Sequence, residues 1–215
     1  MIKIENTEVY GFEASIRGMR NPMNSWDRSD SDCKTIIRDN GKYVEDFIGN
    51  NDLKLMKQLA KAGSVHAKYR RMITVTCDIT APMFWWAEFD TYKVGTVRNS
   101  CSKMHKIHSK ELLNEDFSCE GCREIGSWAT LCFVTVQNTC NKLREKYNET
   151  KEKKYWRALI ELLPESYNQR ATVQLNYEVL ANMYKSRKEH KLDEWHTFCD
   201  WIENLPYGKE LICNA

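Results

Sequence analysis

The amino-acid sequence predicts an α+β fold with few strands and many helices. Residues 2–10 and 71–79 are rich in β-branched and aromatic side chains, which favour strands. Through the second half of the chain, apolar residues recur at helical spacing. The chain has 215 residues, enough to bury a substantial core, and we predict one domain over residues 1–215.

Boundary residues place the elements of the first half of the chain. Asn51 and Asp52 can cap a helix that Gly63 ends, and Pro82 suits the first turn of another helix. The predicted order is strand, helix, loop, helix, strand, helix and an irregular polar segment, over residues 2–10, 11–19, 21–32, 51–63, 71–79, 80–93 and 94–104.

We predict that the second half is almost entirely helical. Helices are expected at residues 123–147, 150–163, 169–188 and 192–204, and Pro164 ends the second of them. The first carries an apolar stripe that should pack in a core: Ile125, Trp128, Leu131, Cys132, Val136, Cys140 and Leu143. Because so little sheet is predicted, we expect copies of the chain to associate and complete the core.

Composition and charge argue against several classes of protein. The 32 Lys and Arg against 30 Asp and Glu leave a net charge of +2, which disfavours nucleic acid or a membrane surface as a partner. No apolar run approaches the roughly 18 residues that span a bilayer, and the start of the chain does not resemble a secretory signal. Nine scattered cysteines suggest reduced thiols, so we expect a cytoplasmic protein.

Cys119 and Cys122 form a C-x-x-C pair whose thiolates could grip a zinc ion. A structural zinc site needs four ligands, and His105 with His108 could complete the set. No second C-x-x-C pair follows, so ordinary thiols are the favoured interpretation and no metal is predicted.

Two further groups of residues have both a functional and a structural interpretation. Trp85 and Trp86, with Phe84 and Phe89, could stack on a flat ring system, but aromatic residues at helical spacing are more often part of a core. A polar group after that helix could recognise a phosphate or a ring edge, or could be a plain solvated loop. Its members are Arg98, Asn99, Ser100 and Ser102. These patterns alone name no reaction.

The polar residues near the end of the chain resemble a motif of the flavin-dependent thymidylate synthase family. That family carries N-x-R-x-L-x-N-x-x-x-x-R, and Asn176, Leu180, Asn182 and Arg187 stand at its offsets 0, +4, +6 and +11. Leu163-Pro164 provides the L-P that precedes the motif, and Trp195 resembles the tryptophan that follows it. The resemblance extends over about residues 53–205, which is most of the chain.

A second family motif, R-H-R-x-x-S-x-N-x-x-S, is matched in part. Thr91-Tyr92-Lys93 stands for R-H-R and Thr96 for the first serine, while Asn99 and Ser102 fit N-x-x-S if one residue is inserted. Ser64-Val65 stands where the family has G-H-x-S-V-x-E-H.

The resemblance implies a small, mainly antiparallel sheet and a helix-rich C-terminal half. It also implies a homotetramer that binds FAD and a dUMP-like pyrimidine nucleotide and transfers a one-carbon unit to C5 of the base, with NADPH and a methylene-folate as further reactants. Arg187 would polarise the uracil ring. The implied flavin contacts are Asn176, Asn182, Lys93, Thr96 and Asn99, and the implied nucleotide contacts are Arg98, Ser100, Ser102 and Arg187.

The chain departs from the family pattern mainly at cationic and histidine positions. Thr91 and Ile160 stand where the family has arginine, Lys103 or Met104 follows the last serine, and Glu178 reverses the charge of another arginine. Both histidines of the serine-valine segment are missing. Each lost charge-assisted hydrogen bond is worth roughly 1.5–3 kcal/mol, unless Arg70, Arg71, Lys93 or Arg98 replaces it. The alternative function is therefore a non-catalytic nucleotide- or protein-binding module that has lost the flavin.

Overall fold

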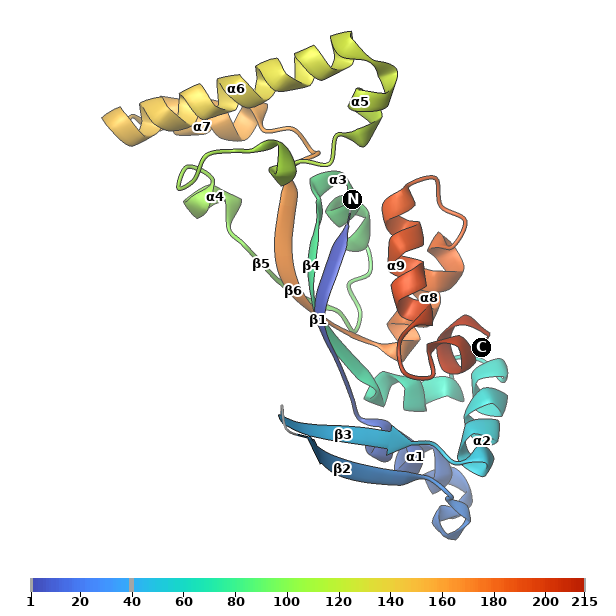
Figure 1. Ribbon diagram of the computed structural model, residues 1–215. Helices are drawn as coiled ribbons and strands as arrows, with labels where there is room; N and C mark the ends of the chain where they lie inside the picture. Colours follow the sequence, from blue (N-terminus) through green and yellow to red (C-terminus); the bar gives the residue numbers. More distant parts are fainter. Residues whose placement is uncertain (1, 39–40, 215) are drawn as a thin grey trace. The chain divides into compact units, whose positions relative to one another are not determined.

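The computed structural model describes residues 2–38 and 41–214, with only the backbone given within 33–46 (Figure 1). It confirms the α+β class. A four-stranded antiparallel sheet has the strand order β1-β4-β6-β5, and a separate antiparallel hairpin pairs β2 with β3. The strands are β1 Lys3–Tyr10, β2 Asp32–Arg38, β3 Gly41–Phe47, β4 Thr74–Pro82, β5 Val97–Ser100 and β6 Asn168–Asn176.

Helices make up most of the rest of the described chain. They are α1 Phe12–Arg20, α2 Asn50–Lys61, α3 Met83–Phe89, α4 Lys103–Lys106, α5 Glu120–Ile125, α6 Ser127–Thr150, α7 Lys153–Leu162, α8 Tyr177–Arg187 and α9 Asp193–Glu203. Short 3-10 turns cover Asn21–Met23, Trp26–Arg28, Ala67–Met72 and Asn114–Asp116. Among the described residues, no helix is both long and apolar enough to cross a bilayer.

The chain divides into two compact units. Unit 1 comprises Met1–Lys3, Asp78–Thr91 and Arg98–Thr172. Unit 2 comprises Ile4–Cys77, Tyr92–Val97 and Val173–Ala215. Divisions fall inside β1, β4, β5 and β6, so each strand of the four-stranded sheet contributes residues to both units.

Aromatic side chains of α3 belong to the core of unit 1. Trp85 and Trp86 are fully buried, and their rings and that of Phe89 meet at centroid distances of 5.0–5.1 Å. The preference for a core role of these residues is therefore confirmed. A second cluster joins α6 and α7 to the segment before them, through Ile107, Leu112, Phe117, Cys140 and Leu159.

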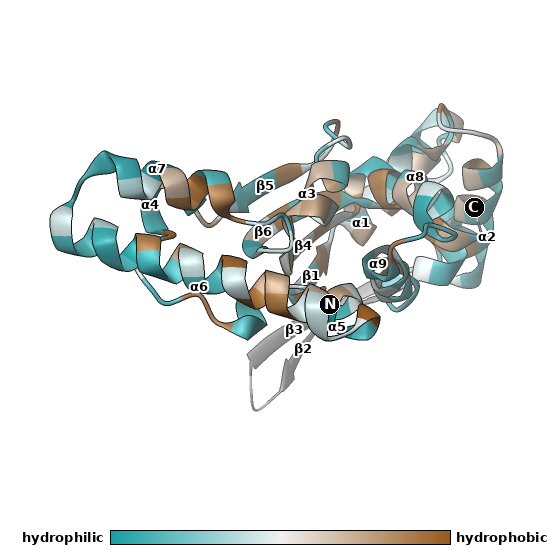
Figure 2. Ribbon diagram, turned by 90° about the horizontal axis from the view of Figure 1, so that it is seen from above, coloured by the Kyte–Doolittle hydropathy of each residue, from teal (hydrophilic) through white to brown (hydrophobic). Residues whose placement is uncertain are grey.

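The apolar stripe predicted along the first long helix is only half buried. Cys140 lies in the core, but Ile125, Trp128 and Leu131 are 65–67% exposed. Figure 2 shows the change along α6, which is brown at its start and teal toward its end. The physical reason is length. At about 1.5 Å per residue, α6 is roughly 36 Å long and α7 only about 15 Å, so α7 covers less than half of it.

Unit 2 is built from α1, α2, α8, α9 and the 3-10 turn Ala67–Met72. Asp52, which was predicted as part of a helix cap, is fully buried instead. Its Oδ1 accepts from Nε of Arg20 at 2.6 Å, and its Oδ2 accepts from the hydroxyls of Ser29 and Ser31. The start of α2 is capped by Asp30, which accepts from the backbone N–H groups of Asn51 and Asp52.

Several predicted boundaries were wrong, and the single helix predicted over residues 123–147 is divided at Gly126 into α5 and α6. Residues 169–176 form β6, not a helix, because buried Ala171, Val173 and Leu175 alternate with exposed neighbours at the two-residue period of a strand. Strand β4 extends through Pro82, so the helix predicted from Thr80 begins at Met83. The segment 94–104 contains β5 and the short helix α4.

The cysteines whose side chains are described are free thiols. They are Cys77, Cys101, Cys119, Cys122, Cys132, Cys140, Cys199 and Cys213. The side chain of Cys33 lies outside the described residues.

Candidate functional site

The residues matched to the C-terminal motif lie on α8 and at its N-terminus. Asn176 is the N-cap residue of the helix, and its Oδ1 accepts a hydrogen bond from the backbone N–H of Val179 at 3.0 Å. This satisfies one of the donors that every helix start leaves unpaired. One part of the motif therefore has a structural role in starting the helix that carries the rest.

The loop Tyr92–Val97 packs against the start of α8. Gly95 has a φ of +75°, a conformation that favours glycine, and a Cβ placed there would lie 2.7 Å from Nδ2 of Asn176. The same atom would lie 3.1 Å from Cγ2 of Val179. Only a residue without a side chain allows the loop to approach the helix this closely.

An aromatic frame surrounds Arg187 at the end of α8. Its Nε donates to the hydroxyl of Tyr92 at 2.9 Å, and its guanidinium carbon lies 4.6 Å from the ring centroid of buried Trp195. Tyr92 meets Trp195 edge to face, with the ring centroids 6.4 Å apart. The hydrogen bond fixes the plane of the guanidinium group, and the cation–π contact stabilises its charge.

Asn182 does not share the surroundings of Arg187. The two residues are five positions apart, which on an α-helix of 3.6 residues per turn is about 140° around the axis. Asn182 is exposed, whereas Arg187 is half-buried. The helix thus brings Arg187 together with Tyr92 and Trp195 and directs Asn182 to another side.

Two predicted contacts lie in the loop itself. Thr96 is half-buried, and its hydroxyl oxygen is shielded from solvent without a hydrogen-bond partner in the part of the chain that the structure describes. Buried hydroxyls normally have a partner, so an unpaired one is a candidate ligand contact. Lys93 is exposed.

Arg98 is held by three groups within unit 1. Its Nη1 donates to Asp90 and its Nη2 to Oε1 of Gln169, both at 2.6 Å. Its guanidinium carbon lies 3.9 Å from the ring centroid of Trp86. The side chain therefore fixes β5 against its neighbours.

The other predicted residues of this segment are exposed. Asn99 and Ser100 lie on β5, and Ser102 caps α4 by accepting from the backbone N–H of His105 at 3.2 Å.

The reversed charge at Glu178 is neutralised inside unit 2. Its carboxylate lies 2.8 Å from Nε of Arg70, and the two side chains are only 10% and 7% exposed. Arg70 also donates to the backbone carbonyl of Leu211 at 3.1 Å. Arg70 is therefore engaged in the core, whereas Arg71 and Lys93 are exposed.

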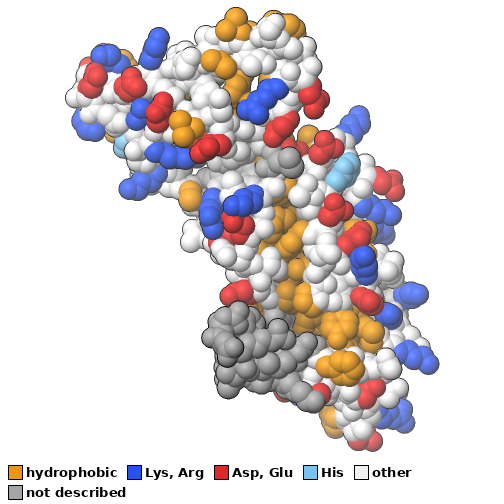
Figure 3. Space-filling model, viewed as in Figure 1, with side chains coloured by type: hydrophobic (Ala, Val, Ile, Leu, Met, Phe, Trp, Pro, Cys, Tyr) orange, Lys and Arg blue, Asp and Glu red, His pale blue; other side chains and the backbone are white. Residues whose placement is uncertain are grey.

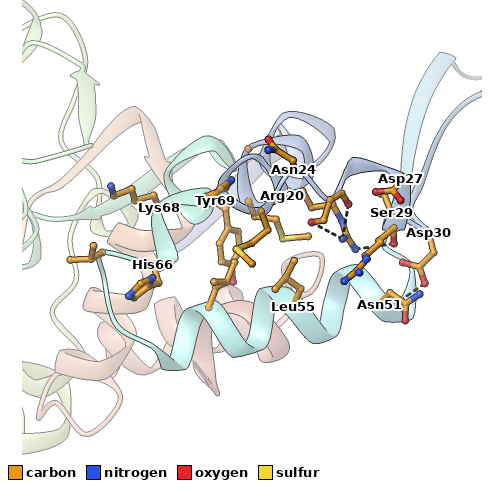
Figure 4. Close-up of a pocket in the computed structure, with 18 residues that line it drawn as sticks. Arg20, Asn24, Asp27, Ser29, Asp30, Asn51, Leu55, His66, Lys68 and Tyr69 are labelled. Atoms are coloured by element: carbon orange, nitrogen blue, oxygen red, sulfur yellow. Dashed lines mark hydrogen bonds between the residues drawn. The ribbon is translucent and has the colours of Figure 1, made fainter.

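A large hollow was not predicted from the sequence. It measures about 1340 Å³ and lies between α2 and the segment that contains α1 and the turns after it (Figure 4). Leu55 and Tyr69 contribute apolar surface, His66 and Lys68 lie at one end, and neither Arg187 nor Asn182 lines it. The sequence predicted a helix with an apolar face over residues 53–60. It did not predict that this helix lines a hollow, because the opposite wall comes from residues distant in the sequence.

The four ligands considered for zinc do not come together. Among the residues that the structure describes, no group of three or more His, Cys, Asp or Glu could hold a metal ion. Cys119 is buried, and this burial raises the pKa of its thiol. His108 packs its ring edge to face against Tyr147 instead.

Comparison with known proteins identifies a shared fold. No family model matches the sequence, and no curated protein matches it. One crystal structure of the flavin-dependent thymidylate synthase ThyX from Helicobacter pylori, with FAD and dUMP, covers 98% of this chain and 97% of its own at 13% identity and a TM-score of 0.69. Another, also with FAD and dUMP, covers 99% and 97% at 16% identity and a TM-score of 0.70. The chain has the fold of these ThyX structures over nearly all of its length.

Proposed function

We propose that this protein is a ThyX-like enzyme that binds FAD and a dUMP-like pyrimidine nucleotide and transfers a one-carbon unit to C5 of the base. One observation carries the proposal. Arg187, Tyr92 and Trp195, which the sequence resemblance matched to three separate family positions, meet in one contact within a ThyX fold.

Arg187 is the proposed catalytic residue, and it also binds the substrate. A guanidinium group stays protonated at any physiological pH and donates in a fixed plane, so it can polarise a ring carbonyl without losing its proton. Tyr92 and Trp195 hold that plane before a ligand arrives. Such preorganisation means that little reorganisation is needed when charge develops on the base.

The loop next to α8 offers suitable contacts for a flavin. Thr96 presents a buried, unpaired hydroxyl within the described chain, and Lys93 is an exposed cation close to it in sequence. A bound flavin would supply the redox chemistry, with NADPH as the proposed reductant and methylene-folate as the proposed source of the one-carbon unit. Asn176, Asn182 and Asn99 complete the proposed flavin contacts, and Arg98, Ser100 and Ser102 complete those to the nucleotide.

We also propose that the protein assembles as a homotetramer. The exposed Ile125 at the end of α5 and the exposed Trp128 and Leu131 near the start of α6 support self-association, because exposed apolar patches often mark an interaction surface. No charged residue occurs between Glu124 and Lys142, so two copies of this helix face could meet without burying a charge.

A second candidate function is a non-catalytic binding module that has lost the flavin. The buried pair of Arg70 and Glu178 favours it, because that pair removes a cation from any ligand site and leaves none in its place. The contacts of Arg98 with Asp90, Gln169 and Trp86 also favour the binding module, because they engage the cation within the protein.

The absorption spectrum of the purified protein separates the two functions. The enzyme should show the visible bands of an oxidised flavin, as purified or after incubation with FAD, whereas the binding module should stay colourless. Calorimetry with dUMP then tests the nucleotide site. Arg187→Ala should weaken dUMP binding at least tenfold, about 1.4 kcal/mol, and Lys185→Ala, an exposed cation on the same helix, should not. If the two variants bind dUMP with equal affinity, Arg187 is not part of the nucleotide site.

A further inference from the structure

Two free thiols, Cys119 and Cys122, lie one turn apart at the start of α5 in unit 1. The backbone N–H of Arg123 donates to the carbonyl of Cys119 at 3.3 Å, which closes a helical turn over the pair. Cα atoms three positions apart in such a turn are about 5 Å apart. A disulfide joins Cα atoms roughly 4.4–6.8 Å apart, so the backbone holds this pair within bridging distance.

The segment that ends at Cys119 is fixed to its neighbours in unit 1. The backbone N–H of Ser118 donates to the carbonyl of Ser166 at 2.8 Å, and its hydroxyl donates to Oδ1 of Asn168 at 2.9 Å. Cys119 itself is only 6% exposed. Its thiol is therefore held in place and shielded from reagents in solution.

Cys122 is more accessible than Cys119. It is half-buried, and the two residues between the cysteines, Glu120 and Gly121, are exposed. A Cβ placed on Gly121 would meet no described residue within 4 Å beyond its own helix, so the space over the turn is open. Figure 3 shows hydrophobic side chains at the surface over the start of α6, the helix that follows α5. A reagent in solution therefore reaches Cys122 before Cys119.

The surroundings of the two thiols give them different roles in an exchange reaction. Burial raises the pKa of Cys119, Arg123 opposes this rise, and Glu120 and Cys122 add to it. Cys119 is therefore protonated at neutral pH in the reduced pair. Because thiol exchange requires a thiolate with access to the other disulfide, Cys122 is the attacking group.

We propose that Cys119 and Cys122 form a reversible disulfide by exchange with a small disulfide of the glutathione type. Neither cysteine belongs to the residues that the family resemblance matched. The proposal therefore goes beyond the flavin, the nucleotide and Arg187.

The exchange has two steps. The Cys122 thiolate attacks one sulfur of oxidised glutathione, which forms a mixed disulfide and releases one glutathione thiolate. Cys119 then loses its proton to solvent, and its sulfur attacks Sγ of Cys122, which forms the bond between the two cysteines and releases the second glutathione thiolate. The two cysteines lose two electrons and two protons, and one oxidised glutathione becomes two reduced molecules.

Mass spectrometry of the full chain tests the closure. The protein is equilibrated with rising oxidised glutathione at a fixed concentration of reduced glutathione, and its free thiols are then alkylated. Trypsin cleavage after Lys110 and Arg123 releases residues 111–123, which contain both cysteines of the pair and no other. We expect this peptide to carry an internal disulfide at an oxidised glutathione concentration at least tenfold below the one that half-modifies exposed Cys132, because the second step is intramolecular. Dithiothreitol should restore both thiols.

Single variants test the two roles. Cys119→Ser should stop the reaction at a mixed disulfide on Cys122, because no second thiol displaces the glutathione. Cys122→Ser should leave Cys119 at least fivefold less modified, because that thiol is shielded. Cys132→Ser removes an exposed thiol of α6 and is the matched control, so closure within residues 111–123 should not change. Circular dichroism checks that each variant is folded, and the measurement on the wild type does not depend on them.

Four results would overturn the proposal. They are a wild-type peptide that carries glutathione without an internal disulfide, closure that needs as much oxidised glutathione as Cys132, equal modification of Cys119→Ser and Cys122→Ser, and closure that is lost in Cys132→Ser. Because no flavin or dUMP is present, the outcome is independent of the proposed enzyme activity.

Discussion

Replacing Asp52 by Asn should destabilise unit 2 strongly. Both carboxylate oxygens are used: Oδ1 accepts from Arg20, and Oδ2 accepts from two hydroxyls and from the backbone N–H groups of Asp30 and Ser31. An amide must turn its NH₂ group toward one of these sets. The serine hydroxyls can rotate to accept, but the guanidinium and the backbone N–H groups cannot.

The magnitude follows from burial. Arg20 is 5% exposed and Asp52 is fully buried, so the variant leaves a buried guanidinium without its counter-charge. Breaking such a pair costs about 3–5 kcal/mol, a large part of the 5–15 kcal/mol that typically stabilises a domain. Urea unfolding followed by circular dichroism measures the change. The exposed pair of Arg17 and Glu13 is the control, and Glu13→Gln should change stability by less than about 1 kcal/mol.

The same carboxylate makes stability depend on pH. Burial raises the pKa of Asp52, but hydrogen bonds from Ser31, Ser29 and Arg20 outweigh it, so the pKa lies below its ordinary value of 3.8. A lowered folded-state pKa adds stability that is fully present above the unfolded value and is lost as pH falls through the folded value. The wild type should therefore lose stability below about pH 4, and Asp52→Asn should lack this part of the dependence. A variant within 1 kcal/mol of wild type at neutral pH would refute the reasoning.

Three further variants test the site and the assembly. Gly95→Ala should lower the free energy of unfolding by about 1–2 kcal/mol, because φ is +75° and the new Cβ meets Asn176. The control is Gly121→Ala, which should not lower it, since a Cβ there has no neighbour within 4 Å. Thermal unfolding of the two variants measures the difference. Tyr92→Phe removes the acceptor for Arg187, so dUMP affinity measured by calorimetry should fall three- to tenfold, up to about 1.4 kcal/mol, with unfolding unchanged. A dUMP affinity equal to wild type would show that the tyrosine hydroxyl does not position the arginine. Trp128→Glu places a charge on the exposed face of α6 and should reduce the mass found by light scattering; an unchanged mass would exclude this face from the interface.

Elements with strong local signals were predictable from the sequence. The helices at 12–20, 50–61, 153–162 and 193–203 lie close to their predicted bounds, and Gly63 and Pro164 mark the ends of two of them as predicted. Strand β6 was missed because no Gly or Pro separates it from α8, so the alternation of its short apolar run was absorbed into a longer helical pattern. The deciding fact, which neighbours cover each face, is not a local property.

The candidate site divides in the same way. The spacing of Asn176 and Arg187 was visible because both lie within one helix and its cap. The pairing of Glu178 with Arg70 could not be foreseen, since 108 positions separate them and several cations were equally available.

These contacts show what two arginines near the candidate site do in a chain that has the fold of the ThyX structures. Arg70 forms a buried ion pair with Glu178, and Arg98 contacts Asp90, Gln169 and Trp86. Arg70 and Arg98 therefore have structural roles, because leaving a buried charge unpaired would cost several kcal/mol. Arg187 is set in a different frame, because its Nε donates to the phenol of Tyr92 and its guanidinium carbon lies over the indole of Trp195. Arg187→Ala, followed by both dUMP affinity and stability to unfolding, therefore separates a ligand site from a structural one: a loss of affinity with unchanged stability indicates a ligand site, and the reverse indicates a structural role.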